Sequence, residues 1–187
     1  ANVVVNAQPA TPATPTVGTI THPTCAVATG SVILSGLPAS GTWTLTRTPG
    51  AVTTTGTGTT ATITGLAPGT YTYTVTNASG CISAASVNVV VNAQPATPAT
   101  PTVGTITHPT CAVATGSVVL SGLPAAGTWT LIRTPGGTTT TGTGTTTTIT
   151  GLAPGTYTYT VTNAAGCISA ASANVVINTQ PATPATP

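Results

Sequence analysis

The chain has 187 residues, a formal net charge of +2, no acidic residue and 40% hydrophobic residues. This composition argues against disorder, because disordered chains are typically poor in hydrophobic residues and rich in net charge. No apolar run approaches the roughly 18 residues of a membrane-spanning helix, so we expect no membrane span in this segment. Lys and Arg together number two, which excludes the basic patch that binding to nucleic acid requires.

The stretch QPATPATP occurs three times, at a constant period of 86 residues, and residues 1–86 differ from residues 87–172 at only eight positions. A period of this length is that of a small independent domain rather than a solenoid repeat. The sequence therefore predicts, in chain order, the last strand of a preceding repeat, a linker, a first domain, a linker, a second domain and a linker, at residues 1–7, 8–15, 16–93, 94–101, 102–179 and 180–187.

Each repeat contains short segments in which apolar residues alternate with polar ones. In GTYTYTVTN at 69–77, Tyr71, Tyr73 and Val75 share one face and threonines share the other, a pattern typical of half-buried strands. Turn sequences such as TPG and GLAPG separate these segments. The fold class predicted is all-β, with tandem immunoglobulin-like (fibronectin type III-like) β-sandwich domains. The seven strands of the first repeat are predicted at 17–22, 31–35, 41–48, 51–57, 60–64, 69–77 and 87–92.

The aromatic residues are predicted to pack inside the two domains, because all of them fall on the inward faces of strands. A carbohydrate-binding surface would need exposed aromatic rings, so core packing is the better interpretation. Strand 87–92 is expected to place Val87, Val89 and Val91 on one face. Arg47 and Arg133 have no acidic partner in the chain and are expected to lie over a neighbouring aromatic ring or to extend to solvent. The expected core aromatics are Trp43, Tyr71, Tyr73, Trp129, Tyr157 and Tyr159.

Each repeat carries two cysteines, which suggests one disulfide bond per domain. Cys25 is expected to pair with Cys81, and Cys111 with Cys167, with the tryptophan of each domain packed against the bond. Closing a loop of about 57 residues would stabilise so small a domain by roughly 4 kcal/mol. Such bonds also imply an oxidising, extracellular location.

Proline recurs at every third position of QPATPATP, which matches the threefold period of polyproline II. The linkers are therefore predicted to be extended, semi-rigid spacers that hold neighbouring domains roughly 25 Å apart along the chain. The residues expected to stiffen them are Pro9, Pro12, Pro15, Pro95, Pro98 and Pro101.

Little in the sequence suggests catalysis. General acid–base chemistry requires a histidine, a carboxylate or a lysine, and each repeat offers a single histidine, His22 or His108, which we interpret as a loop residue. Zinc needs three or four ligands and calcium needs carboxylate oxygens. We therefore predict no enzymatic activity, no catalytic residue, no metal site and no cofactor.

The segments GLAPGTYTYTVTNASGC at 65–81 and GLAPGTYTYTVTNAAGC at 151–167 resemble the SprB-like and related immunoglobulin-like repeats of very large surface proteins of Bacteroidota. The resemblance covers most of each repeat and depends on strand and turn residues. It implies an exported adhesin or surface filament, handled by type IX secretion and located outside the cell on the bacterial surface. Asn77 and Asn163 stand where that pattern often has Asp.

These observations favour a structural, non-enzymatic extracellular fibre or stalk of tandem immunoglobulin-like repeats that forms a cell-surface filament. The alternative is a repetitive adhesin whose ligand-binding domain lies outside this segment and whose receptor the sequence does not identify. A surface almost without charge, with edge strands that lack lysine, predicts self-association of the chains into filaments. The threonine-rich segment 138–150 could also form an ice-binding surface, although the twist of small sandwiches argues against this function.

Overall fold

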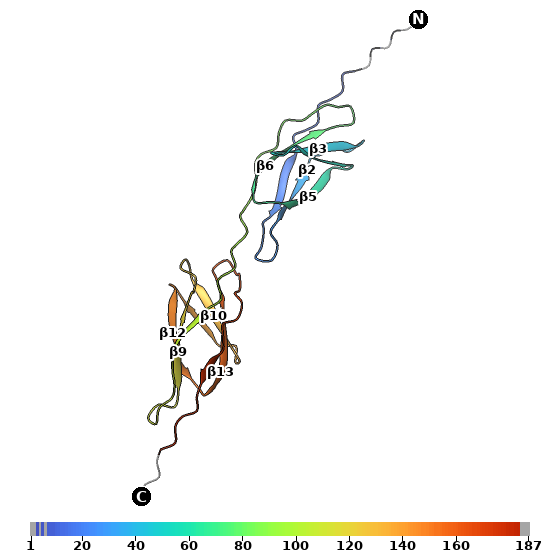
Figure 1. The fold of residues 1–187 in the computed structure, drawn as a ribbon. Coiled ribbons are helices and arrows are strands. Elements are labelled where there is room, and N and C mark those ends of the chain that lie inside the picture. The colour runs from blue at the N-terminus through green and yellow to red at the C-terminus, as the bar shows by residue number, and fades with distance from the viewer. Residues whose placement is uncertain (1–2, 4, 6, 184–187) are drawn as a thin grey trace. The chain divides into compact units, whose positions relative to one another are not determined.

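A computed structural model describes the chain except residues 1, 2, 4, 6 and 184–187 (Figure 1). It divides into two compact units, Ala1–Gln94 and Pro95–Pro187, so the division falls inside the linker predicted at 94–101. Every regular element of the described residues is a β-strand. None of them forms a helix long and apolar enough to cross a membrane.

The first domain is an all-β sandwich of the immunoglobulin-like class. One sheet has the strand order β1-β2-β5 and the other has the order β4-β3-β6-β7, with all neighbours antiparallel. All seven predicted strands are confirmed, with ends that differ by two residues at most. The strands are β1 (Thr16–Thr21), β2 (Gly30–Ser35), β3 (Trp43–Thr48), β4 (Val52–Gly56), β5 (Thr60–Leu66), β6 (Gly69–Thr76) and β7 (Val89–Val91).

The second domain repeats this topology, with a three-stranded sheet β12-β9-β8 and a four-stranded sheet β11-β10-β13-β14 (Figure 1). The likeness follows from the near identity of the two repeats, since the eight differing positions do not alter the alternation of any strand. The strands are β8 (Thr102–Thr107), β9 (Gly116–Ser121), β10 (Trp129–Thr134), β11 (Thr139–Gly142), β12 (Thr146–Leu152), β13 (Gly155–Thr162) and β14 (Val175–Ile177).

Each sandwich encloses its own apolar core, built from the inward faces of the strands. In β6, Tyr71, Tyr73 and Val75 are buried while the threonines between them are less buried, as the alternation predicts. The expected core aromatics are buried in both domains, apart from Tyr157, which is partly buried and packs against the core. Val87 corrects one prediction: its side chain is 72% exposed, because β7 begins only at Val89.

The tryptophan of the first domain packs against a glycine rather than against a disulfide, which corrects the sequence prediction. A Cβ atom added at Gly56 on the neighbouring strand would lie 2.5 Å from Cη2 of Trp43, so only glycine fits opposite the indole ring. The indole Nε1 donates a hydrogen bond to the Gly58 carbonyl at 2.8 Å. The polar group of the buried ring therefore has its hydrogen-bond acceptor just after β4, in the same sheet. The second domain repeats the arrangement.

A tyrosine near the start of β6 ties this strand to the turn that precedes it. The hydroxyl of Tyr71 donates a hydrogen bond to the Ala67 carbonyl at 2.8 Å, and Tyr157 bonds to Ala153 at 2.9 Å in the second domain. Such a tyrosine corner is a hallmark of immunoglobulin-like sandwiches. Cζ of Arg47 lies 5.0 Å from the centroid of the Tyr71 ring, which confirms the predicted stacking of arginine on an aromatic residue.

Two buried serines complete the edge of β6, which β7 covers only from Gly69 to Tyr71. Beyond that point, Ser83 accepts a hydrogen bond from the Val75 amide through Oγ and donates its own amide to the Val75 carbonyl. Ser86 does the same for Tyr73. The Ser-x-x-Ser spacing thus pairs an irregular segment with the strand, and few edge groups of β6 remain open.

Candidate functional site

The described residues contain no group of three or more side chains that could hold a metal ion and no cavity of ligand size. The two histidines lie in exposed loops, as predicted. Nδ1 of His22 accepts a hydrogen bond from the Asn92 amide at 3.3 Å, and His108 does the same for Asn178. The side-chain hydrogen bonds outside the core lie instead at the two ends of each domain.

These two ends follow from the strand directions. In the first domain, Gly69 at the start of β6 pairs with Val91 at the end of the antiparallel strand β7. β6 then continues past the start of β7 as far as Thr76. The turn after β6 therefore lies at the end of the domain opposite to the point where the chain leaves β7. We call the end with the turn at residues 77–81 the entry end, and the end with the β1–β2 loop at residues 22–29 the exit end.

At the entry end, one asparagine holds both the turn and the segment that leads into the domain. Oδ1 of Asn77 accepts hydrogen bonds from the amides of Ser79 and Cys81, at 3.1 and 3.0 Å. Its Nδ2 donates to the carbonyl of Ala10 at 2.9 Å. The Cys81 thiol beside it donates to the Pro9 carbonyl at 3.7 Å. The incoming linker is thereby fixed to the domain that follows it.

This geometry requires an asparagine rather than an aspartate at position 77. A carboxylate has acceptors only, whereas an amide side chain accepts and donates at once. Asn77 needs both functions, because it accepts from the turn and donates to the linker. The same Nδ2 group is the one that an N-linked glycan would occupy at Asn77-Ala-Ser, so the folded structure disfavours glycosylation there.

At the exit end, a glutamine holds the segment that leaves the domain. Nε2 of Gln94 donates to the carbonyls of Thr24 and Cys25, both at 3.2 Å. The β1–β2 loop is itself closed by a hydrogen bond from the Thr24 amide to the Val27 carbonyl at 2.9 Å. The outgoing linker is thus bound to the loop that carries Cys25.

The second domain repeats both clamps with the same chemistry. Nδ2 of Asn163 donates to the Ala96 carbonyl at 2.9 Å. Nε2 of Gln180 donates to the carbonyls of Thr110 and Cys111, both at 3.1 Å. Two copies that preserve every donor and acceptor identify the clamps as a property of the repeat. Sequence reasoning missed them, although the identical Asn-x-x-Gly-Cys and Gln-Pro pairs were visible in both copies.

The proline period predicts extended, semi-rigid linkers, and the structure adds that they are attached to the domains beside them. Pro15 and Pro101, at the ends of two linkers, are buried, and Pro12 and Pro98 are half-buried. Only the first four residues of the linker at 180–187 are among the described residues. Of the preceding strand predicted at 1–7, Val3 and Val5 are each 87% exposed and belong to no strand, while residues 1, 2, 4 and 6 lie outside the described residues.

The cysteines correct the largest error of the sequence analysis. Cys25 and Cys167 are disulfide-bonded, whereas Cys81 and Cys111 are free. The predicted bonds Cys25–Cys81 and Cys111–Cys167 are therefore wrong. The physical reason is that the two cysteines of one domain lie at its opposite ends.

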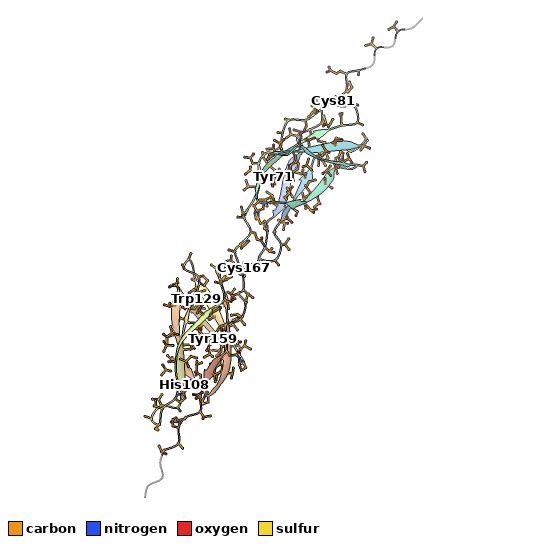
Figure 2. All side chains as sticks on the ribbon, in the orientation of Figure 1. Tyr71, Cys81, His108, Trp129, Tyr159 and Cys167 are labelled. Atoms are coloured by element: carbon orange, nitrogen blue, oxygen red, sulfur yellow. The ribbon has the colours of Figure 1, made fainter. Side chains whose placement is uncertain are left out.

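Figure 2 shows this separation in the second domain, where Cys167 lies near one end and His108, three residues before Cys111, lies near the other. In the first domain the contacts agree, since Cys81 touches Pro9 before the domain and the Cys25 carbonyl accepts from Gln94 after it. No domain can close its own bond in this geometry.

In the described part of the first domain, Tyr73 has a shifted pKa, and its role is structural. Burial raises the pKa of Tyr73, and the nearby Arg47 charge offsets part of that shift. Its hydroxyl is buried and has no hydrogen-bond partner among the described residues. It faces the core rather than a cleft, so its raised pKa concerns stability and not catalysis.

Comparison with known proteins finds no matching family model and no matching curated protein. Among solved structures, the chain is similar to the human OSCAR ligand-binding domain, with a TM-score of 0.36 and 17% identity over 89% of this chain and 99% of that one. It is also similar to the chicken CNTN1 FN1–FN3 domains, with a TM-score of 0.37 and 15% identity over 91% and 68%. A third likeness is to the BSP domain of a biofilm associated protein, with a TM-score of 0.31 and 16% identity over 89% and 29%. At these scores none of them bears on what this chain does.

Proposed function

We propose that this chain is a non-enzymatic, extracellular structural segment, in which immunoglobulin-like domains follow one another end to end in a filament or stalk. The observation that carries the proposal is the pair of linker clamps. Asn77 and Asn163 hold the segment that enters each domain, and Gln94 and Gln180 hold the segment that leaves it. A chain that fixes both of its connections on every repeat is built to transmit orientation and load along its length.

The chemistry of the surface supports a structural role over a catalytic one. The described residues offer no cavity and no group of three or more side chains that could hold a metal ion. The chain also has no acidic residue. A disulfide bond within the chain supports an oxidising environment, because cytosolic thiols are normally kept reduced. The resemblance to SprB-like repeats of Bacteroidota supports a bacterial cell surface as the location.

Self-association, in this proposal, runs mainly along the array. Register irregularities interrupt the edge strand β1 between Val17 and Ile20 and the edge strand β5 near Ile63, and such bulges hinder pairing with another edge. Ser83 and Ser86 form hydrogen bonds with the backbone of β6 beyond the part that β7 covers. The edges left for lateral contact are that of β4, with the sequence VTTTG, and that of the three-residue strand β7.

The clamps can be tested with a matched pair of variants. Gln94→Glu removes the two donors at the junction between the domains, whereas Gln180→Glu removes the same donors after the second domain. Both are studied under reducing conditions, so that the hydrogen bonds alone are tested. We expect Gln94→Glu to broaden the distribution of interdomain distances between spin labels, one on each domain, and Gln180→Glu to leave it at the wild-type width.

Longer arrays provide the second measurement. Electron microscopy of chains with many repeats should show rods with a regular axial repeat. Equal distance distributions in the two variants, together with flexible beads on a string in the images, would contradict the proposal. An isolated adhesive tip on otherwise flexible chains would favour the alternative of an adhesin whose repeats merely space its binding domain.

A further inference from the structure

The edge strands of the first domain differ in how well they could pair with a further strand. The edges of its two sheets are β1, β5, β4 and β7. Register irregularities interrupt β1 and β5, and β7 is three residues long. By contrast, β4 pairs with β3 at five consecutive residues, from Val52 to Gly56, without an irregularity. The second domain repeats this regular edge in β11, from Thr139 to Gly142.

The sequence of this regular edge lacks the features that usually prevent pairing with another strand. Natural edge strands are protected by charged side chains, proline or bulges. The sequence of β4 is VTTTG and that of β11 is TTTG, so both strands are uncharged and rich in the β-branched residues that favour strands. Residues 52–55 of β4 are exposed. The edge is therefore open to a further strand.

The hydrogen-bond pattern shows which backbone groups of the edge point outward. In the second domain, the amide of Arg133 donates to the carbonyl of Thr138 at 2.9 Å. Hydrogen-bonded and non-hydrogen-bonded pairs alternate along an antiparallel ladder, so Thr140 also bonds to β10. Thr139 and Thr141 therefore turn their amide and carbonyl groups away from their own sheet.

The first domain has the same register, so Thr53 and Thr55 are its outward-facing positions. We propose that β4 pairs antiparallel with β4 of a second copy of this chain, with Thr54 opposite Thr54 at a twofold axis. Such an interface is isologous, since both copies use the same surface. β11 carries the equivalent site, centred on Thr140. This inference rests on the proposed extracellular filament, for which it names the lateral contact and its partner.

The position of the twofold axis follows from the outward-facing backbone groups. With Thr54 at the axis, Thr53 of each copy lies opposite Thr55 of the other, and both of these pairs exchange their N–H···O=C bonds. An axis at Thr53 would need Ala51 as a partner, which has a φ of 47° and lies outside the strand. An axis at Thr55 would need Thr57, which lies beyond the end of β4. The axis at Thr54 therefore keeps every bonded residue within the strand.

The side chains favour the same pairing, because two rows of threonines cross the outer face of the four-stranded sheet. The rows are Thr53–Thr46–Thr74 and Thr55–Thr44–Thr76. Pairing of Thr53 with Thr55 of the second copy joins each row of one sheet to the other row of its partner. Cross-strand threonine pairs stabilise neighbouring strands. The contact between copies thus continues a contact that each sheet already contains.

The first test places charge at the proposed axis in both domains. Thr54→Lys/Thr140→Lys and Thr54→Glu/Thr140→Glu each bring like charges together between copies, which is strongly unfavourable at an interface. Sedimentation velocity at low salt, under reducing conditions, should show each variant alone associating at least about tenfold more weakly than the wild type. An equal mixture of the two variants should recover the association of the wild type, because opposite charges then meet.

The matched control is Thr62→Lys/Thr148→Lys, which adds the same charge to β5 and β12. These two threonines are exposed and lie on edges with register irregularities. The control should associate as the wild type does. Equal weakening in the control and in the variant with lysine at the axis would assign the effect to net charge and would overturn the proposal. A mixture of the lysine and glutamate variants that stays monomeric would overturn it as well.

The second test removes a backbone donor of the contact without adding charge. In Thr55→Pro/Thr141→Pro, the amides lost are those that face away from their own sheets, so the ladders within the domains stay complete. Far-ultraviolet circular dichroism should match that of the wild type, while association should weaken by about tenfold. Association at the wild-type level would show that the copies do not meet through these edges.

The pairing of edges and the proposed filament fail separately. A wild-type chain that stays monomeric at every concentration in sedimentation velocity would overturn the pairing of β4 and β11 between copies. The linker clamps are measured through the distance distributions of Gln94→Glu and Gln180→Glu, and neither substitution lies in β4 or β11. A broader distribution in Gln94→Glu, together with a monomeric wild type, would leave the clamped array in place without this lateral contact.

Discussion

The two domains of this chain are nearly the same molecule placed at two positions of an array. Their strand order, cores, tyrosine corners and linker clamps are the same, apart from a β11 one residue shorter than β4 and a less buried Tyr157. They differ in their cysteines, since the first domain uses its exit-end Cys25 in a disulfide and the second uses its entry-end Cys167. The comparison teaches that near-identical repeats build the same core and the same clamps whichever of their cysteines is bonded.

The independence of the two cores can be tested by the largest substitution. Trp129→Ala should lower the unfolding free energy of the second domain by about 3–5 kcal/mol, because it removes a fully buried ring. Trp43 then remains as the fluorescent reporter of the first domain, whose transition should not move under reducing conditions. Trp43→Ala is the mirror control. A shift of both domains by either variant would contradict separate cores.

Two tyrosines on β6 provide a smaller test within one domain. Tyr73→Phe removes a buried hydroxyl that has no partner, so we expect the unfolding free energy to stay the same or to rise by about 1 kcal/mol. Tyr71→Phe removes the hydrogen bond to Ala67 and should lower it by about 1 kcal/mol. Denaturant titration of the two variants distinguishes them. Equal losses would mean that the Tyr73 hydroxyl is satisfied.

One of the eight differences between the repeats is a natural experiment in backbone strain. Ala51 has a φ of 47° in the turn after β3, where the second domain has Gly137 with a φ of 60°. Left-handed backbone is unfavourable for residues with a Cβ atom. Ala51→Gly should raise the stability of the first domain by about 1 kcal/mol, and Gly137→Ala should lower that of the second by a similar amount. Opposite signs would place the cause elsewhere in the turn.

The smallest expected change is that with pH. Burial raises the pKa values of Tyr73 and Tyr159, so their neutral forms contribute stability that is fully present below the unfolded value of about 10. That stability is lost as the pH rises through the folded value. The chain has no side-chain carboxylate to protonate, so melting temperatures should be nearly constant between about pH 4 and pH 7 and unaffected by EDTA. A Tyr73→Phe/Tyr159→Phe variant should lose less stability above pH 10 than the wild type.

The fold was predictable because its signal is local. Alternation places Trp43, Leu45, Tyr73 and Val75 on inward faces within single strands, and turn residues separate the strands. A core of such residues does not need an internal disulfide. The one misplaced inward residue, Val87, lies outside β7, where serine hydrogen bonds replace strand pairing.

The ends of the domains were not predictable because their contacts are distant in sequence and polar. Asn77 bonds to Ala10, 67 residues away, and Gln94 bonds to Thr24, 70 residues away. Neither contact leaves a periodic pattern. Four cysteines allow three pairings, and the spacing alone does not decide among them. The assumption that a small core needs its own disulfide selected the wrong pairing.

The central claim is that each repeat is fixed to its linkers at both of its ends, and the spread of interdomain distances tests it most directly. Under reducing conditions, Gln94→Glu should broaden the distribution of distances between spin labels on the two domains, because it removes the donors that hold the linker between them. Gln180→Glu removes the equivalent donors after the second domain and should leave the distribution at the wild-type width. Equal distributions in the two variants would contradict the account.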